Sequence, residues 1–146
     1  MLNTSLCFNS YSTDSQYICF DSCDNGLVSG RLAVLSVKKS MDFSSVMELI
    51  NGVEYFLDNF SVVERNESPR LFSGQSYDTH KDVLCSDLNG LVSGRLATFC
   101  VNIKFRQNST WQGEAVWLET GKKESFRSAL ELLIMLDRAL CSIQNR

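Results

Sequence analysis

Two copies of one nine-residue stretch carry the side chains best suited to bind a small anion. Asn-Gly-Leu-Val-Ser-Gly-Arg-Leu-Ala occupies residues 25–33 and recurs unchanged at residues 89–97. In each copy a serine hydroxyl and an arginine guanidinium flank a glycine, which lets the backbone approach a ligand closely. Two such segments would suit a phosphate-bearing or other anionic ligand. The candidate ligand-binding residues are Ser29, Gly30, Arg31, Ser93, Gly94 and Arg95.

The same residues also have a structural interpretation. A glycine can create a β-bulge in a strand, and an arginine beside it then lies on the solvent face. The segment matches neither a P-loop nor a Gly-x-Gly-x-x-Gly fingerprint, so the phosphate signal has low specificity. The structural interpretation is favoured, and the directions of the two arginine side chains decide between the two.

The cysteines, the histidine and the carboxylates provide weaker evidence for a metal site or a catalytic site. Cys19 and Cys23 lie on one face of a predicted strand, but no second pair of ligands has zinc-site spacing. The single histidine, His80, is five residues from Cys85 across a predicted loop, which is weak support for a nucleophile and its base. No two carboxylates are placed to have the separated pKa values that hydrolysis needs. The sequence therefore predicts no metal, no cofactor and no enzymatic activity.

Composition narrows the range of partners. The 146-residue chain is 44% hydrophobic, enough for a real core, and its net charge of −3 argues against general nucleic-acid binding. Residues 1–64 carry 3 basic and 8 acidic groups (−5), whereas residues 102–146 carry 7 basic and 5 acidic groups (+2). No signal peptide, long apolar span or regular spacing of the six cysteines is evident. We expect a cytoplasmic protein without a membrane segment.

The elements around each copy suggest a sheet. Each Asn-Gly suits a type I′ hairpin turn, preceded by a predicted strand at residues 17–23 or 82–88 and followed by a longer one. After the second copy, apolar and polar residues alternate from residue 97 to residue 106, which predicts a strand with one buried face.

This alternation places Phe105 in the core and the cations Lys104 and Arg106 on the wet face. A further strand is predicted at residues 111–117, where Glu114 is expected to neutralise one of the two cations. Because the aromatic residues do not share a face with the basic ones, a surface for stacking RNA bases is disfavoured.

A predicted helix follows the strands in each half. Similar apolar stripes begin at Phe43 and at Phe126, and Glu48 and Glu131 recur at matching positions, which suggests a shared structural role. The second helix is apolar over a wide arc, so it is either enclosed by the sheet and the first helix or part of a homodimer contact. The predicted helix starts are Ser40 or Asp42 in the first half and Glu124 or Ser125 in the second.

We therefore predict an α+β fold, with an antiparallel sheet covered by two helices. Two duplicated ββα-type halves related by a pseudo-twofold axis are expected: a shorter ββα copy at residues 1–64, a linker at residues 65–82 and a longer βββα copy at residues 83–146. Together they are expected to form one compact domain.

The second half resembles small uncharacterised bacterial ββα proteins. The resemblance covers residues 96–140 and depends on a strand with Trp-Gln-Gly, followed by a helix that begins Phe-Arg-Ser-Ala-Leu-Glu-Leu. It implies a bacterial or bacteriophage source and supplies no catalytic residue. The first half departs from the pattern because it lacks the Trp-Gln-Gly strand.

Two functions follow as hypotheses. The first is a non-enzymatic regulator or inhibitor that binds another protein, with the acidic first half docking on a basic partner or mimicking nucleic acid. The acidic residues in question are Asp14, Asp21, Asp24, Asp42, Glu48, Glu54 and Asp58. The alternative is a binder of a small anionic ligand through the two repeated segments. An enzyme that uses Cys85 would need a depressed thiol pKa.

Overall fold

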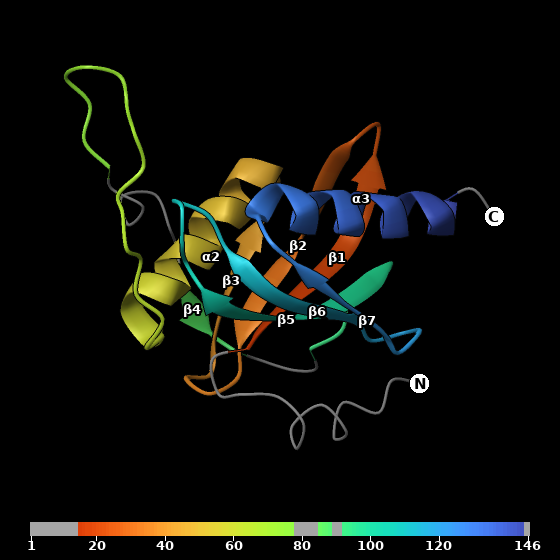
Figure 1. Ribbon diagram of the computed structural model, residues 1–146. Coiled ribbons are helices and arrows are strands. Elements are labelled where there is room, and N and C mark those ends of the chain that lie inside the picture. The colour runs from red at the N-terminus through yellow and green to blue at the C-terminus, as the bar shows by residue number, and fades with distance from the viewer. Residues whose placement is uncertain (1–14, 78–84, 89–91, 145–146) are drawn as a thin grey trace.

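The chain forms one antiparallel sheet with two helices packed against it (Figure 1). The computed structural model describes residues 15–77, 85–88 and 92–144. Across the sheet the strand order is β4-β3-β2-β1-β5-β6-β7. The predicted α+β class is thereby confirmed. The elements in chain order are β1 (Gln16–Asp24), β2 (Leu27–Val34), β3 (Lys39–Phe43), α2 (Val46–Phe60), β4 (Ser86–Asp87), β5 (Ala97–Phe105), β6 (Gln112–Trp117), β7 (Lys122–Phe126) and α3 (Ala129–Gln144).

The predicted duplication of two ββα halves is not confirmed. The first half contains a third strand, β3, that the sequence pattern did not indicate. The two identical nine-residue copies also occupy different places. The first forms the turn after β1 and most of β2, whereas residues 92–96 of the second form no strand and only residue 97 begins β5. Identical sequences therefore adopt different structures because their tertiary contacts differ.

The hairpin prediction holds for the first copy. Asn25 and Gly26 have φ angles of 53° and 79°, the pair of positive values that a type I′ turn needs. The second Asn-Gly lies outside the described residues. The strand predicted before it is wrong in its pairing, because β4 pairs with β3 at the edge of the sheet and β5 pairs with β1 and β6.

Both helices begin later than predicted. Residues up to Phe43 and Phe126 are held extended by pairing with β2 and β6, so Ser40, Asp42, Glu124 and Ser125 belong to strands. The N-cap of α2 is Ser45, whose hydroxyl accepts the Glu48 N–H at 3.1 Å. In α3, Ser128 accepts the Glu131 N–H at 3.1 Å in the same way. Because each glutamate also accepts a backbone N–H just before its helix, both belong to N-terminal caps.

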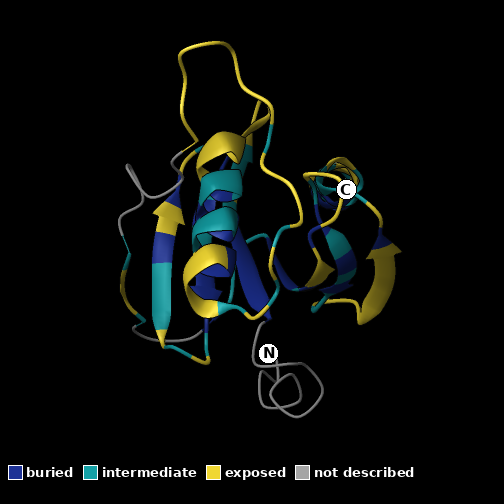
Figure 2. Cartoon of the chain, turned by 60° about the vertical axis from the view of Figure 1, so that its left-hand side comes forward, coloured by how far each residue is buried: buried dark blue, intermediate teal, exposed yellow. Residues whose placement is uncertain are grey.

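The main core lies between the sheet and the two helices. In Figure 2 the strands behind α2 are largely dark blue, which marks them as buried. Leu49, Val53, Phe56 and Leu57 of α2 enter this core from one side, and Leu132, Leu136, Ala139 and Leu140 of α3 enter it from the other. The opposite face of the sheet carries a smaller apolar cluster of Tyr17, Cys19, Ala33, Val92, Cys100 and Val116.

A β-bulge in β5 reverses part of the predicted pattern. Ile103 pairs with Gly113 and Phe105 pairs with Gln112, so Lys104 is an extra residue in the ladder. Beyond the bulge the alternation changes face. Phe105 is therefore 56% exposed rather than in the core, and Arg106 is 4% exposed rather than on the wet face.

Candidate functional site

A second β-bulge shapes the first repeated segment. The pairing of β1 with β2 shifts between Phe20 and Ser22, so Asp21 is an extra residue beside Gly30. A Cβ at Gly30 would lie 1.8 Å from the carbonyl oxygen of Cys19. The glycine is therefore required by the close approach of two backbones, as the structural interpretation expects.

The second repeated segment lies against the same place. The Leu96 N–H donates to the Phe20 carbonyl at 2.9 Å, and the Gly94 N–H donates to the Thr98 hydroxyl at 2.8 Å. A Cβ at Gly94 would lie 2.2 Å from the Ala97 carbonyl oxygen and 2.7 Å from the Phe20 nitrogen. Both glycines of the repeat thus permit backbone contact within the protein.

The two copies meet at Asp21. Its carboxylate accepts the Arg95 backbone N–H at 3.0 Å and pairs with the Arg31 Nε at 3.4 Å. The Arg31 guanidinium also donates to the Ser93 carbonyl at 2.5 Å. We call Asp21, Arg31, Ser93 and Arg95 the Asp21 clasp. It joins the segment that leads into β5 to the bulge in β1.

All six candidate ligand-binding residues thus have contacts within the chain, and for Arg95 the contact is made by the backbone N–H. The Ser29 hydroxyl shares a hydrogen bond with the Ser22 hydroxyl at 2.5 Å, and the Arg31 guanidinium is occupied by Asp21 and Ser93. Arg95 is exposed, and its guanidinium forms no hydrogen bond or ion pair with the part of the chain that the structure describes. The anionic-ligand hypothesis keeps one available cation where the sequence suggested two.

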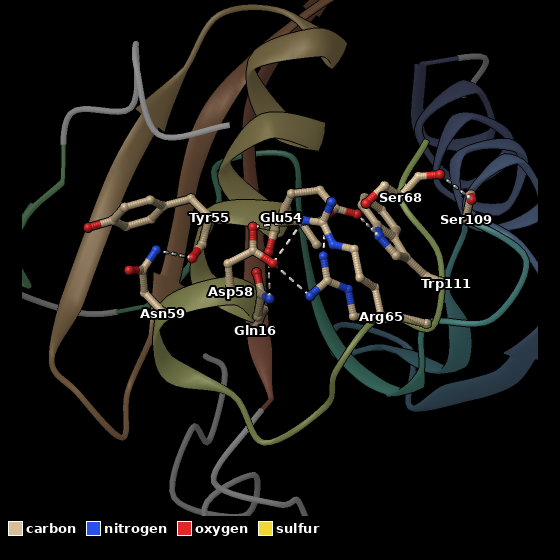
Figure 3. Close-up of polar contacts among 11 residues, drawn as sticks. Gln16, Glu54, Tyr55, Asp58, Asn59, Arg65, Ser68, Ser109 and Trp111 are labelled. Atoms are coloured by element: carbon tan, nitrogen blue, oxygen red, sulfur yellow. Dashed lines mark hydrogen bonds and ion pairs between the residues drawn. The ribbon is translucent and has the colours of Figure 1, made fainter. Parts of the chain in front are cut away.

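The sequence analysis did not predict the densest polar cluster among the described residues, which Figure 3 shows. Arg106 pairs with Glu54 and with Asp58, the latter at 2.8 Å. Arg65 pairs with the same two carboxylates, at 3.3 Å and 2.8 Å. The Trp111 indole N–H donates to Glu54 at 2.5 Å. We call these five residues the arginine–carboxylate cluster.

The charges of this cluster are neutralised by one another. Two carboxylates face two guanidinium groups, so their formal charges cancel. Burial alone would raise the pKa of Asp58, but hydrogen bonds from Arg106 and Arg65 outweigh it and lower that pKa. The Arg65 guanidinium also lies 4.7 Å from the centre of the Tyr77 ring. The cluster therefore attaches the chain after α2 to the sheet and leaves no proton acceptor poised for catalysis.

Part of this cluster had a signal in the sequence. Glu54 and Asp58 are four residues apart and border the apolar stripe of α2, which places them at the edge of the core. The sequence interpretation assigned both to an acidic docking surface. The bulge at Lys104, which turns Arg106 toward them, has no local sequence signature.

Cys19 and Cys85 do not have the lowered thiol pKa that a nucleophile needs. Burial raises the pKa of Cys19 to about 12 and also raises the pKa of Cys85 despite the nearby Lys39 ammonium. His80 lies outside the described residues. Among the residues that are described, no group of three or more histidine, cysteine, aspartate or glutamate side chains is arranged to hold a metal ion.

An apolar groove separates the two helices. It has a volume of about 170 Å³, with Phe20 and Val28 of the sheet below and Val46 of α2 opposite Leu133 and Leu140 of α3. We call this the interhelical groove. Val46 in its wall is 38% exposed. Leu130 and Ile134, on the exposed face of α3, are 66% and 49% exposed.

Comparisons with known proteins found no relative: no family model, no curated protein and no solved structure matches the chain. None of the helices within the described ranges is both long enough and apolar enough to cross a membrane.

Proposed function

We propose that this protein is a non-enzymatic regulator or inhibitor that acts by binding another protein at the interhelical groove. The observation that carries the proposal is the apolar lining of that groove, in which Val46 is 38% exposed, together with the exposed Leu130 and Ile134 on α3. Leu130 and Ile134 are one helical turn apart on α3, and Leu130 is also one turn from Leu133 in the groove wall. Clustered apolar side chains of this size are typical of interaction sites.

The sequence indicated that α3 is too apolar to be covered on one side only. In the structure, Leu132 and Leu136 face the sheet and are buried, whereas Leu130 and Ile134 remain exposed. The helix α2 contributes Val46, which lines the groove and is 38% exposed. A partner that covers these three residues would bury apolar surface worth roughly 25 cal/mol per Å².

The shape and charge of the groove favour an amphipathic helix that carries basic residues. A channel between two helices is suited to receive a third helix through its apolar face. Asp137 lines the groove next to Cys23. Burial raises the pKa of the Cys23 thiol, and the thiol of Cys141 and the carboxylates of Asp137 and Asp24 raise it further. This end of the groove is therefore acidic, which favours a basic partner.

The acidic docking surface is smaller than the sequence suggested. Glu54 and Asp58 are neutralised in the arginine–carboxylate cluster, Glu48 caps α2, and Asp21 belongs to the clasp. Asp14 lies outside the described residues. The groove, rather than a broad acidic face, is thus the better candidate for the partner site.

The test compares a groove variant with a matched surface variant. Leu130→Glu/Ile134→Glu places charge on the exposed face of α3, within one turn of Leu133 in the groove wall, and Val62→Glu/Phe72→Glu makes the same change at residues that are 86% and 85% exposed elsewhere. Each protein is used for affinity capture from lysate of the source cell, with quantitative mass spectrometry. We expect the wild type and the control to retain one stoichiometric protein, and the groove variant to bind it at least about tenfold more weakly.

Three outcomes would contradict the proposal. Equal capture by the groove variant would place the contact elsewhere. Recovery of a bound metabolite and no protein would favour a ligand-binding function. A homodimer in sedimentation analysis that the groove variant dissociates would make a second copy of this chain the occupant.

A further inference from the structure

A larger cavity lies on the other flank of α3. Its volume is about 430 Å³, within the range of small-molecule sites. Phe99, Ala115 and Trp117 of β5 and β6 form its floor, and Met135 and Ala139 of α3 cover it. We call it the α3–β7 pocket. It shares Leu136 with the interhelical groove, but the groove is otherwise lined from α3 by Leu133, Asp137 and Leu140.

The sequence of β7 explains why this space is not filled by the core. Along β7 every second residue faces the helix, and Phe126 at its end is buried in the main core. The two preceding positions on that face, Glu124 and Lys122, are charged and exposed, and both line the pocket. The underside of α3 therefore meets an apolar side chain at only one end of β7.

The pocket wall contains a buried donor that lacks an acceptor. The indole nitrogen of Trp117 is inaccessible to solvent and has no hydrogen-bond partner in the described part of the chain. An unpartnered buried N–H is a cost to the folded state. Trp111, the other tryptophan, already donates to Glu54 and serves as an internal comparison.

The charged side chains at the rim of the pocket indicate the charge of the ligand that it favours. Lys122 pairs directly opposite Trp117 in the sheet. Of the two lysines at the pocket, Lys123 is paired with Glu114 at 3.0 Å, whereas the Lys122 ammonium forms no ion pair with any residue that the structure describes. Glu124 also lines the rim, and its carboxylate accepts the Ser125 N–H at 3.0 Å. Lys122 is the cation available to a ligand.

We propose that the α3–β7 pocket binds a small apolar carboxylate, with the hydrocarbon part against Phe99, Trp117 and Met135 and the carboxylate beside Lys122. This function goes beyond protein binding at the interhelical groove, and the two use different sides of α3.

The experiment uses three ten-carbon probes with one tail and different heads: decanoate, decan-1-ol and decylammonium. Because the chain has two tryptophans, ¹H–¹⁵N spectra show two indole signals, which a Trp117→Phe variant assigns. We expect decanoate to shift the Trp117 signal and leave the Trp111 signal in place. Decanoate should bind about tenfold more tightly than decan-1-ol, and decylammonium more weakly than both.

Two variants test the geometry. Ala139→Phe should fill the pocket and abolish binding of all three probes, with the fold checked by circular dichroism. Lys122→Gln changes an exposed side chain, so it should fold, keep decan-1-ol binding and lose the preference for decanoate. Lys38→Gln, at an exposed lysine in the turn after β2, is the matched control and should behave like the wild type.

The proposal is overturned if decanoate leaves the Trp117 signal unchanged up to about 1 mM, which corresponds to about −4.1 kcal/mol. It is also overturned if decan-1-ol or decylammonium binds as tightly as decanoate, or if Lys122→Gln retains the preference. None of these outcomes depends on whether a protein occupies the interhelical groove.

Discussion

At the scale of single residues, Arg106 links the end of β5 to α2, a contact that no sequence pattern predicted. Its side chain is 4% exposed and holds Glu54 of α2 and Asp58 one turn further along the helix. Without it, two partly buried carboxylates would share the single guanidinium of Arg65. Removing one partner of such a cluster costs more than the pair contributes, because charge is left uncompensated.

We therefore expect Arg106→Met, which keeps the length and loses the charge, to lower the free energy of unfolding by about 3–5 kcal/mol in urea titrations. Lys104→Met is the control, since Lys104 is close in the same strand and pairs with Glu114 in an exposed position. It should unfold almost like the wild type. Equal unfolding midpoints for the two variants would show that the cluster contributes nothing to stability.

At the scale of elements, Gly52 shows how a helix is fitted to the sheet. In an isolated helix this glycine costs about 1 kcal/mol relative to alanine. In the structure, however, a Cβ at Gly52 would lie 2.2 Å from the Met41 sulfur and 3.1 Å from a Leu32 methyl group. Both neighbours are buried, so the gain in helix propensity is opposed by overpacking.

We expect Gly52→Ala to destabilise the protein by about 1–3 kcal/mol, contrary to helix propensity. In a double-mutant cycle with Met41→Ala, the alanine methyl group should occupy the space that Met41 vacates. The double variant should then be about as stable as Met41→Ala alone, with a coupling energy above roughly 0.5 kcal/mol. Stabilisation by Gly52→Ala, measured by chemical denaturation, would contradict the close helix–sheet contact.

The cap of α3 gives a prediction with a defined pH range. Hydrogen bonds from the Arg127 side chain and backbone lower the pKa of Glu131 from 4.5 to about 2. Because the folded pKa is below the unfolded one, the stabilisation is complete above about pH 4.5 and is lost as the pH falls toward 2. The difference in Tm between wild type and Glu131→Gln should therefore be constant near neutral pH and shrink below pH 4.5.

Ser128→Ala provides the comparison for that measurement. It removes the hydroxyl that accepts the Glu131 N–H and should cost about 1 kcal/mol. Since a hydroxyl does not titrate in this range, its Tm deficit should persist at low pH. A Glu131→Gln deficit that also persists below pH 3 would contradict the lowered pKa.

At the scale of the whole molecule, local patterns predicted what depends on local contacts. Alternation indicated β5 up to Ile103 and the inward face of β6, and Asn25-Gly26 indicated its turn. The sequence interpretation failed where distant segments decide the structure. Pairing with β2 makes residues 39–43 a strand rather than a helix start, and an extra residue at Lys104 exchanges the faces of the next two side chains.

The repeated segment shows the same limit most clearly. Its glycines were attributed either to a ligand or to a bulge, and the structure places both where backbones approach each other. The two copies contact one another through Asp21 because the chain passes from β4, at the edge of the sheet, to β5, which lies beside β1. The sequence of nine residues alone cannot predict this connection between distant strands.

The Asp21 clasp predicts how the segment before β5 is held. Asp21→Ala removes the acceptor of the Arg95 N–H and the ion-pair partner of Arg31, whose side chain is partly buried. We expect a loss of about 1–3 kcal/mol in unfolding free energy and faster hydrogen exchange at the Gly94 to Leu96 amides. Asp24→Ala, at an exposed acid in the same strand, should change neither.

If the clasp is structural, phosphate should not slow exchange at these amides in the wild type, because Arg31 is already occupied. Protection by millimolar phosphate that disappears in Arg95→Ala would instead make the repeat an anion site. Unchanged exchange in Asp21→Ala would show that the contacts between the two copies do not hold the segment. Hydrogen exchange at these amides therefore distinguishes a structural role of the repeated sequence from a role in anion binding.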